Sequence, residues 1–383
     1  MTDVPTASRE AAREPAADTL PHRQAKRRNE KAIPMRDTMT AVRLHAPGDL
    51  RLDEVPVPEP RSGEVLIKVW RSGICGTDLH IAKGTFPAPN LPLTLGHEFS
   101  GTIAALGLNT GSLAVHDNVV VDINIACGQC FFCRRSQKLF CPAVSQLGVH
   151  SSGGLAEYVV VPVSNVYVLP QSLSLDAAAY VEPLACAIHG QDRIGIKSGE
   201  RVLIIGGGPM GLAHIALAKL SGASNVIVSE PDPDRREVAK RLGADNVLSP
   251  FDSGFADEVA YMTDGVGPDV VIEAVGSIPT YEAAISLVRR GGRVLAYGAA
   301  PQTASMSLRP FDIYSKELTI VGSYAGTYDT WPRAIELLAS GRFDPALIVD
   351  SVRPLSEAIE AIRGLETDKS IVKVHIQMSS NPS

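Results

Sequence analysis

The spacing of hydrophobic residues divides the chain into two regions of different character. Between Thr40 and about Pro162, short strand-like runs stand between turns, for example at 65–69, 119–121 and 158–161. This pattern is typical of a β-rich domain. From Arg201 onward, short and continuously apolar segments alternate with segments of helical spacing. That alternation predicts buried parallel strands with helices packed against them.

The second region indicates the fold class. Its expected strands cover 202–205, 226–229, 270–272, 294–296 and 318–321, and its expected helices cover 233–242 and 280–288. Repeated strand–helix units form a doubly wound parallel sheet. We therefore predict an α/β protein in which such a sheet lies beside a β-rich domain.

The two ends of the chain differ from both regions. Residues 1–38 show no apolar period, and the stretch from Arg23 to Lys31 holds five basic residues and one acidic residue. Acidic residues throughout this segment do not fit a transit peptide, so we predict a disordered extension. Near the other end, the spacing predicts a helix at 331–338 and a last strand at 371–376.

Composition narrows the class of protein. Of 383 residues, 45% are hydrophobic and 20% are charged, which excludes a disordered chain. The 36 basic and 42 acidic residues give a net charge of −6, so we expect no nucleic-acid partner. The longest uncharged run, Val202–Ala218, is interrupted by glycines and is too short to span a membrane, so we expect a cytoplasmic protein. Six cysteines in so long a chain suit metal ligands or free thiols better than disulfides.

A glycine-rich turn follows the first predicted parallel strand. It places Gly206, Gly208 and Gly211 in the pattern G-x-G-x-x-G, with Pro209 and Met210 at the start of the next helix. The first glycine permits the tight turn, the second lets the backbone approach a pyrophosphate, and the third brings helix and strand together. The turn therefore predicts a dinucleotide site, and a glycine turn without a ligand is the alternative.

Glu230 ends the following strand and indicates which dinucleotide binds. A carboxylate at this place accepts hydrogen bonds from the ribose hydroxyls and repels a 2′-phosphate, which favours NAD over NADP. Arg235 and Arg236 lie nearby in the sequence, and an arginine there can accommodate that phosphate. We predict NAD as the cofactor and include Arg235 among the residues of its site.

Four cysteines gather in one short segment, at Cys127, Cys130, Cys133 and Cys141. Four thiolates can close a tetrahedral shell around zinc and leave no open position for a substrate. We therefore predict a structural zinc site. An iron–sulfur cluster and thiols without a metal are the alternatives.

A second candidate metal site is dispersed along the chain. Its members are Cys75, the pair His97 and Glu98, and Glu182. Taken singly, each of these residues could be an ordinary buried side chain. Together, a thiolate, an imidazole and carboxylates suit a zinc ion that keeps an open position for water or an alcohol.

These motifs together resemble the zinc-dependent medium-chain alcohol dehydrogenases, and above all the branch that contains sorbitol, other polyol and threonine dehydrogenases. The resemblance covers about residues 40–376 and is carried by the segments 73–78, 96–98, 127–141, 154–158, 182–184 and 206–211. It implies a GroES-like catalytic domain formed by residues 39–186 and 323–383, with a Rossmann domain at 187–322 inserted between them. Residues 1–38 have no counterpart in the family.

The resemblance also implies roles at the dispersed site. Cys75 and His97 match ligands of the catalytic zinc, and Glu98 matches a carboxylate that can bind the metal directly. Glu182 lies where the polyol branch has a carboxylate ligand, bound directly or through water, and where the simple alcohol dehydrogenases have cysteine.

Further positions match residues that act on the substrate and the cofactor. Thr77 matches the hydroxyl that takes the substrate proton, and His80 matches a histidine that can pass this proton to solvent. Gly76 departs from members that place an arginine there against the pyrophosphate. The positions that match backbone lining the nicotinamide pocket are Val275, Gly276, Gly298, Ala299 and Ser323.

The function implied is oxidation of a secondary alcohol, a polyol or vicinal diol, to a ketone, with hydride transfer to NAD and two zinc ions per chain. A homodimer or homotetramer is expected from the family. The alternatives are an L-threonine 3-dehydrogenase, a general secondary-alcohol dehydrogenase, a non-catalytic zinc- and nucleotide-binding protein, and a zinc-free quinone or enoyl reductase. Phe86, His150 and Tyr324 are candidate pocket residues.

Overall fold

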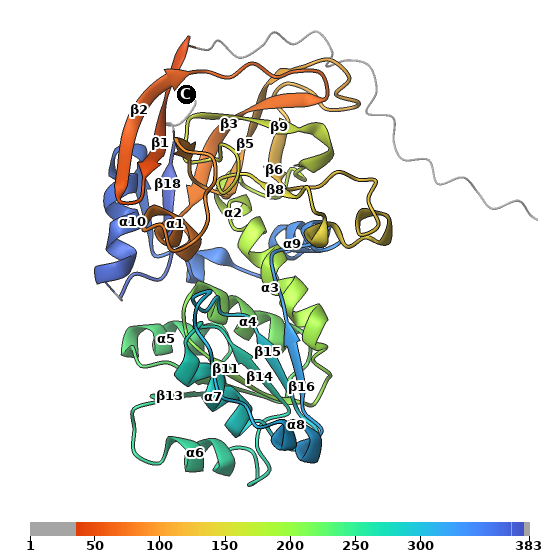
Figure 1. Ribbon diagram of the computed structural model, residues 1–383, viewed down its shortest axis with the longest axis vertical. Coiled ribbons are helices and arrows are strands. Elements are labelled where there is room, and N and C mark those ends of the chain that lie inside the picture. The colour runs from red at the N-terminus through yellow and green to blue at the C-terminus, as the bar shows by residue number, and fades with distance from the viewer. Residues whose placement is uncertain (1–35, 369, 379–383) are drawn as a thin grey trace, which may run out of the picture.

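Two domains stand one above the other in the computed structural model, which describes residues 36–368 and 370–378 (Figure 1). The upper domain contains the first described residues together with the last ones, and the lower domain contains the residues between them. Residues 1–35 of the predicted extension lie outside the described residues, and the proposed domain limits stay predictions. No helix within the described ranges is long and apolar enough to cross a membrane.

The upper domain is built on a largely antiparallel sheet with the strand order β10-β6-β5-β3-β18-β17. β3 (Glu64–Gly73) pairs with β5 (Glu98–Leu106), β9 (Tyr158–Pro162) and β18 (Val374–Gln377). The predicted last strand is therefore confirmed, although it begins at Val374 rather than at residue 371. Because β18 lies next to the central strand β3, the last residues of the chain belong to the core of this domain.

Smaller elements complete the upper domain. The other strands are β1 (Thr38–Ala46), β2 (Asp49–Pro56), β4 (Leu93–Thr94), β6 (Asn118–Val121), β7 (Asn124–Ile125), β8 (Ser145–Gln146), β10 (Val166–Val168) and β17 (Ser351–Pro354). The helices are α1 (Gly76–Ala82), α2 (Leu175–Ala178) and α10 (Ala358–Thr367), with the 3₁₀ turns η1 (Cys133–Arg135), η2 (Lys138–Phe140), η3 (Val163–Asn165), η4 (Pro345–Leu347) and η5 (Leu355–Glu357).

The lower domain is a parallel sheet of six strands in the order β13-β12-β11-β14-β15-β16. The strands are β11 (Arg201–Ile205), β12 (Asn225–Ser229), β13 (Asn246–Leu248), β14 (Val270–Glu273), β15 (Arg293–Ala296) and β16 (Thr319–Gly322). The helices are α4 (Pro209–Leu220), α5 (Pro233–Arg241), α6 (Phe255–Tyr261), α7 (Ile278–Leu287) and α8 (Pro310–Lys316). The five predicted strands and two predicted helices are confirmed to within two residues.

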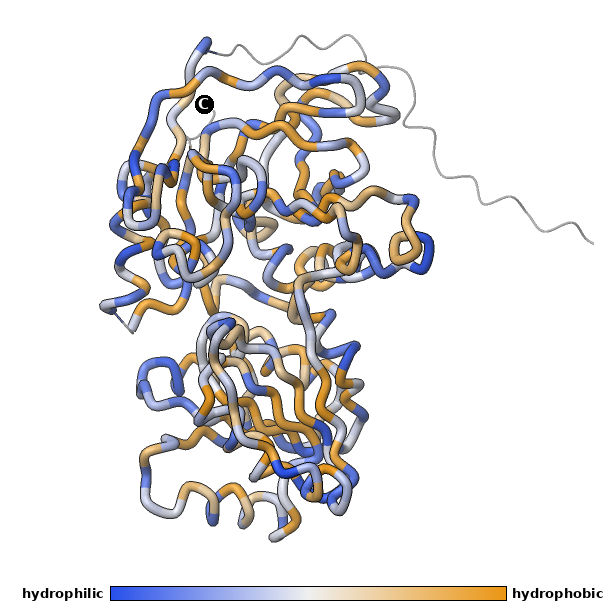
Figure 2. The backbone as a smooth tube through the Cα atoms, in the orientation of Figure 1, coloured by the Kyte–Doolittle hydropathy of each residue, from blue (hydrophilic) through white to orange (hydrophobic). Residues whose placement is uncertain are grey.

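The central strands of this sheet are apolar and buried along almost their whole length, as expected where helices cover both faces (Figure 2). The strand order reverses between β11 and β14, which both lie at the middle of the sheet. In open parallel sheets, ligands bind at the carboxyl ends of the strands that flank this point. The fold therefore places a ligand crevice at the end of β11, where the glycine motif lies.

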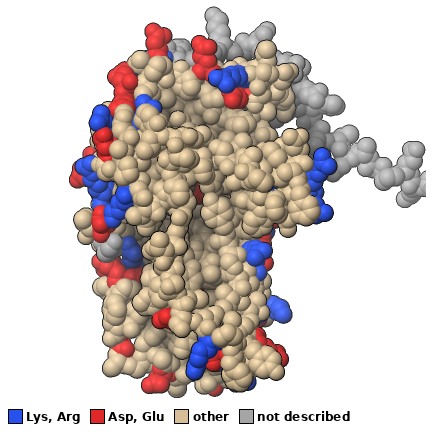
Figure 3. Space-filling view, viewed as in Figure 1, with Lys and Arg blue, Asp and Glu red and all other residues tan. Residues whose placement is uncertain are grey.

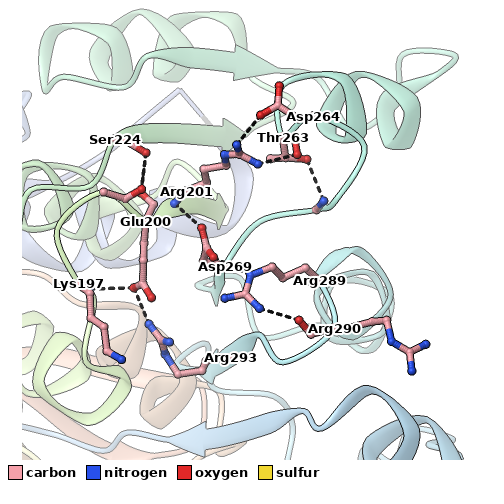
Figure 4. A network of polar contacts seen from close by, with 12 residues as sticks. Lys197, Glu200, Arg201, Ser224, Thr263, Asp264, Asp269, Arg289, Arg290 and Arg293 are labelled. Atoms are coloured by element: carbon pink, nitrogen blue, oxygen red, sulfur yellow. Dashed lines mark hydrogen bonds and ion pairs between the residues drawn. The ribbon is translucent and has the colours of Figure 1, made fainter.

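A polar network lies at the amino ends of the same strands, opposite the expected crevice (Figure 4). Asp269 precedes β14, and its carboxylate accepts hydrogen bonds from the backbone N–H of Arg201 at 2.8 Å and from Arg289 Nε at 2.6 Å. Glu200 precedes β11 and accepts a hydrogen bond from Arg293 Nη2 at 2.5 Å. These contacts tie together the starts of three neighbouring strands, far from the expected crevice.

Aromatic residues pack where the two domains meet. The helices α3 (Val181–Ile194) and α9 (Thr330–Ala339) pack against each other here, and α3 also packs on α4. Trp331 is fully buried and stacks on Tyr167 with ring centroids 6.0 Å apart. Tyr180, also fully buried, stacks on Phe343 at 5.6 Å. This core contains residues of both domains and therefore fixes the position of one domain relative to the other.

Candidate active site and metal centres

Strand pairing brings three members of the dispersed metal site together. Gly73 at the end of β3 pairs with Glu98 at the start of β5, and Cys75 follows Gly73 by two residues. The ligand atoms of Cys75, His97 and Glu98 all lie within 4.8 Å of one another. We call these three residues the catalytic metal group. A thiolate, an imidazole and a carboxylate form a donor set that fits zinc with an open position.

The chain around His97 leaves little room. Gly96 has φ +90°, and a Cβ there would meet the backbone nitrogen of Leu155 at 2.5 Å. Only glycine adopts this conformation without strain in so close a contact. Gly96 therefore allows His97 and Glu98 to enter the site side by side.

Asp78 orients the group, although the sequence analysis did not single it out. This buried carboxylate accepts hydrogen bonds from the N–H of Cys75 at 2.9 Å and of Gly96 at 3.2 Å, and its Oδ1 lies 3.5 Å from His97 Nδ1. Burial raises the pKa of Asp78, but the charge of His97 and the hydrogen bonds outweigh it and lower the pKa. A carboxylate behind a metal-binding histidine fixes the ring and its tautomer.

His97 is held in a strongly anionic environment. Burial lowers its pKa, but Asp78 and Cys75 act in the opposite direction and raise the pKa well above the usual value. A metal ion binds the neutral imidazole, so it must displace this proton. Metal affinity at the group is therefore expected to fall as the pH falls.

Lys373 is a second residue that sequence reasoning missed. It lies just before β18, is almost completely buried, forms an ion pair with Glu98 and donates to the carbonyl of Ile74 at 2.9 Å. Burial lowers the pKa of Lys373, but the charges of Glu98 and Cys75 outweigh it and raise the pKa. Lys373 therefore stays charged and balances part of the negative charge of the group.

Glu182 lies beside the catalytic metal group but outside its compact core. It stands in the first turn of α3, is buried, and its Oε1 accepts a hydrogen bond from Cys186 Sγ at 3.1 Å. Burial raises the pKa of Glu182 to about 7, and the nearby charge of His97 partly opposes this. Its role as a metal ligand stays a prediction. The contact of Cys186 with Glu182 places this thiol next to the site.

The two residues predicted to move a proton lie on α1. Thr77 is half-buried in the first turn, with its Oγ1 3.7 Å from Cys75 Sγ. His80 is exposed, and its Nδ1 lies 3.2 Å from Thr85 Oγ1. The positions agree with an inner hydroxyl and an outer imidazole, and both roles stay predictions.

The four cysteines at 127, 130, 133 and 141 form a second compact group, again with all ligand atoms within 4.8 Å. Cys133 Sγ lies 3.5 Å from Cys130 Sγ and 4.0 Å from Cys127 Sγ. Hydrogen bonds from the N–H groups of Gln129 and Cys130 lower the pKa of the Cys127 thiol to about 6, which favours the thiolate that binds metal. The donor set fits a closed zinc site. Two assembled metal groups do not fit a zinc-free reductase.

The glycine motif lies at the predicted crevice. Gly206 follows β11, Gly208 caps α4, and Pro209 and Met210 form the first turn of that helix. A side chain at Gly211 would collide with the carbonyl of Gly206. The start of α4 therefore approaches the strand closely, and its free N–H groups can receive a phosphate.

Glu230 is bound into this turn from the end of β12. It is buried, and its carboxylate accepts hydrogen bonds from the N–H of Gly207 at 2.6 Å and of Asp232 at 2.9 Å. Arg235 donates to the carbonyl of Ile371 at 2.6 Å, and Arg236 donates to the carbonyl of Glu230 at 2.8 Å. Both arginines are thus directed to backbone carbonyls.

The predicted nicotinamide-lining residues gather at the carboxyl ends of β14, β15 and β16. The N–H groups of Val275 and Gly276 donate to Glu273 at 3.0 and 2.9 Å, and Tyr281 donates to the carbonyl of Gly298. The other members, Ala299 and Ser323, follow β15 and β16, and the N–H of Ser323 bonds to Ala296 at 3.3 Å. Glu273 is fully buried and organises this loop, a role that no sequence signal indicated.

The three candidate pocket residues have different surroundings. Phe86 packs at the edge of the upper core, while His150 Nδ1 accepts a hydrogen bond from the N–H of Gln146 at 3.2 Å. The Tyr324 hydroxyl donates to Gln146 Oε1 at 2.8 Å. Few charged side chains cover the middle of the face in Figure 3, where the surface is hollowed.

Comparisons with known proteins agree with this geometry. Residues 61–171 match the family model of the alcohol dehydrogenase GroES-like domain, and residues 209–340 match that of the zinc-binding dehydrogenases. An L-threonine 3-dehydrogenase of Pyrococcus horikoshii is 39% identical over 88% of this chain and 99% of its own length. A D-arabitol-phosphate dehydrogenase of Enterococcus avium is 33% identical over 91% of this chain and 99% of its own length.

A solved structure supports the same assignment. A protein from Sinorhizobium meliloti 1021, described as a zinc-binding dehydrogenase and bound to NADP, is 35% identical with a TM-score of 0.85, over 90% of this chain and all of that one. The sequence resemblance and the predicted fold class are confirmed. The chain belongs to the zinc-dependent medium-chain alcohol dehydrogenases, enzymes that combine a GroES-like domain with a Rossmann domain and use zinc and NAD(P).

Proposed function

We propose that this enzyme oxidises a secondary alcohol with a neighbouring hydroxyl, a polyol or vicinal diol, to a ketone with NAD. The observation that carries the proposal is the donor set of the catalytic metal group, where Glu98 and the nearby Glu182 supply carboxylates. Carboxylates make a site harder and more polar than a second thiolate would. A substrate with two hydroxyls can bond to such groups, whereas a long apolar alcohol would leave them unpaired.

The protein's own residues divide the remaining tasks. Bound zinc would lower the pKa of an alcohol, and bound nicotinamide would accept the hydride. Cys75 and His97 would hold the metal, with Asp78 fixing the imidazole. Thr77 accepts the substrate proton, and the exposed His80 passes it to solvent.

Glu182 suits contact with a polar substrate. Its pKa of about 7 lets the carboxyl either donate or accept a hydrogen bond at physiological pH. The first turn of α3 can therefore offer a hydrogen-bond partner to a hydroxyl or a water molecule next to the metal. The carboxyl of Glu182 can bind the metal directly or through a water molecule, and either arrangement supports the proposal.

NAD is proposed over NADP because Glu230 stands at the ribose position. Its buried carboxylate would repel a 2′-phosphate, and Arg235 and Arg236 each donate to a backbone carbonyl. The Sinorhizobium meliloti structure is bound to NADP, so cofactor choice is a property of each member and needs measurement.

L-threonine is the second candidate substrate, because a threonine dehydrogenase is 39% identical to this chain. Its ammonium group would suit the carboxylates, but its own carboxylate needs a cation. Lys373 is already paired with Glu98. A polyol places no such demand on the site, which favours it over L-threonine and over a simple secondary alcohol.

We also propose a homodimer or homotetramer located in the cytoplasm. The edge strand β16 leaves Ile320 exposed, and Phe311 and Tyr314 of the neighbouring α8 are largely exposed as well. An open apolar edge of this kind suits pairing with a second copy. The six cysteines, all among the described residues, form no disulfide with one another, as in proteins of reducing compartments. Light scattering of the purified enzyme tests the oligomeric state.

A substrate panel tests the proposed function. Initial rates of NADH formation are compared for four- to six-carbon polyols, a vicinal diol, L-threonine, 2-butanol and hexanol at equal concentrations of NAD. We expect kcat/KM for the best polyol or diol to exceed that for hexanol by at least about tenfold. Equal efficiencies for hexanol and the polyols would contradict the proposal, and a preference for L-threonine would establish the second candidate.

A further inference from the structure

A buried lysine connects the four-cysteine lobe (residues 127–141) with the body of the upper domain. Lys138 begins η2, and the N–H of Cys141 donates to its carbonyl at 3.0 Å. Phe131 and Phe140 of the same lobe are exposed, yet the side chain of Lys138 is completely buried. A buried ammonium group destabilises the fold unless a partner compensates its charge. The lobe thus sends one lysine inward, and burial lowers the pKa of its amino group to about 7.

Asp122 is the partner of this lysine. One carboxylate oxygen, Oδ2, forms an ion pair with Lys138 Nζ, which also lies 4.1 Å from the centre of the Tyr328 ring. The other oxygen, Oδ1, accepts hydrogen bonds from the backbone N–H of Asn124 at 3.0 Å and from its side-chain amide at 3.1 Å. An ionised carboxylate only accepts hydrogen bonds. The carboxylate of Asp122, with a weaker contribution from the carbonyl of Gly326 at 3.4 Å, therefore holds the NH₂ end of the Asn124 amide toward Asp122.

The orientation of Asn124 determines the orientation of the next two side chains. Asn124 presents Oδ1 to Gln146, whose Nε2 donates to it at 2.7 Å. Gln146 consequently presents Oε1 to Tyr324, whose hydroxyl donates to it at 2.8 Å. Each amide has one donating end and one accepting end, so each step follows from the one before. The proton of Tyr324 is committed to Gln146, and the phenol oxygen remains free to accept.

Tyr324 ends this chain of hydrogen bonds at the candidate active site. Tyr324 directly follows Ser323, a predicted nicotinamide-lining residue at the carboxyl end of β16, and the charges of Cys186, His97 and Glu182 act on its hydroxyl. Burial is the main cause of its raised pKa, so the hydroxyl stays neutral at physiological pH. The residue as a whole is 53% exposed. An oriented acceptor with access to the site suits a hydroxyl donor of a bound substrate.

We propose that Tyr324 accepts a hydrogen bond from the non-reacting hydroxyl of the substrate, and that Lys138 is a positioning residue that orients it through Asp122, Asn124 and Gln146. This inference rests on the proposed function, because a diol or polyol supplies the second hydroxyl. It gives the four-cysteine lobe a part in substrate selection. A monohydric alcohol has no second hydroxyl to donate to Tyr324. Its kcat/KM should therefore not depend on how Tyr324 is oriented.

The variant Tyr324→Phe tests the contact itself, since it removes the acceptor and keeps the ring. Kinetics are measured with 2,3-butanediol and 2-butanol, two four-carbon secondary alcohols that differ by one hydroxyl. We expect kcat/KM for the diol to fall about tenfold, mainly through KM, and kcat/KM for 2-butanol to change less than twofold. Tyr261→Phe, at an exposed tyrosine of α6 in the other domain, is the matched control and should change neither value.

The double variant Lys138→Met with Asp122→Leu tests the positioning role. Removing Lys138 alone would leave a buried charge without a partner, whereas the double variant replaces the ion pair by neutral groups. Leu at 122 offers the Asn124 amide no acceptor, so its orientation is left to the weaker contact with the carbonyl of Gly326 at 3.4 Å. We expect the same selective loss on the diol, with unchanged zinc content. Should this variant not fold, Gln146→Met interrupts the same chain next to Tyr324 and is expected to act alike.

The outcomes separate this inference from the proposed function. Unchanged diol kinetics in Tyr324→Phe, or equal losses on both alcohols, would overturn the contact. Unchanged diol kinetics in a folded variant with an interrupted chain would overturn the role of Lys138. The proposed function is judged on wild-type enzyme alone, by its preference between the diol and 2-butanol, whereas Tyr324 is judged by the change in their ratio.

Discussion

Asp78 is the residue whose replacement tests the geometry of the catalytic metal group most directly. Asp78→Asn keeps the size of the side chain but turns one of its two accepting ends into a donor. In the native site these ends accept from the N–H groups of Cys75 and Gly96, and Oδ1 faces His97. Whichever way the amide turns, its NH₂ group meets a backbone N–H. The variant therefore loses one hydrogen bond and the negative charge behind His97.

The expected size of the effect follows from these contacts. A hydrogen bond to a charged acceptor contributes about 1.5–3 kcal/mol, and the buried N–H left unpaired adds to the loss. We expect the free energy of unfolding to fall by about 3 kcal/mol. Loss of the partner of a metal-binding histidine lowers metal affinity about 10- to 100-fold. Because metal binding would need less proton displacement without Asp78, its pH dependence should also become weaker.

The assay combines thermal unfolding with zinc titration against a chromophoric chelator. Asp257→Asn is the matched control, because Asp257 stands at the same third position of another seven-residue helix, α6, but is exposed. This control should change neither stability nor zinc affinity appreciably. A folded Asp78→Asn protein with wild-type zinc affinity and wild-type stability would refute the assigned role of Asp78.

Three further predictions concern other parts of the molecule. Cys130→Ser should lower the melting temperature and the zinc content by one ion per chain before it affects the chemistry, since a closed thiolate site stabilises its lobe; an unchanged melting temperature with both ions retained would exclude this. Glu230→Ala should raise kcat/KM with NADP relative to NAD, because the buried carboxylate no longer repels the 2′-phosphate; a wild-type enzyme that already prefers NADP would contradict it. Burial lowers the pKa of His214 in the folded protein to about 3, whereas in the unfolded chain it is about 6.5. As the pH falls below about 6.5, His214 therefore takes up a proton in the unfolded chain but stays neutral in the folded protein. Relative to His214→Leu, the wild type should therefore lose about 1.4 kcal/mol of unfolding free energy per pH unit between pH 6 and pH 4. No such trend is expected above pH 7. If the two proteins gave parallel curves of stability against pH, His214 would be protonated in the folded protein and the reasoning would be wrong.

Buried groups of opposite charge surround the catalytic metal group and compensate one another. Cys75, Glu98 and Asp78 bring negative charge into a region with little access to water, and Lys373 compensates part of it. A zinc ion would compensate more. Since unpaired buried charges are costly, the group is most stable when the metal and Lys373 are both in place. This balance couples the C-terminal strand β18 to the metal site.

The sequence by itself determined the features that depend on residues close together in the chain. The spacing of Cys127, Cys130, Cys133 and Cys141 predicted one compact thiolate group, because four ligands in so short a segment need no distant partner. The glycine motif and the strand–helix alternation predicted the parallel sheet and its crevice, because hydrophobic periodicity reflects local burial. Family resemblance then identified Cys75, His97 and Glu98 as one site, which spacing alone left open.

Only the tertiary structure decided which distant residues complete the sites. The register of β3 with β5 brings Cys75 to Glu98, and the pairing of β18 with β3 places Lys373 against the same carboxylate. Neither Lys373 nor Lys138 carries a local signal, because lysines are usually solvated and their burial depends on a carboxylate partner that only the fold supplies. Strand register and hydrogen-bond direction arise from contacts between segments far apart in the sequence, and a single sequence does not encode such contacts in any local pattern.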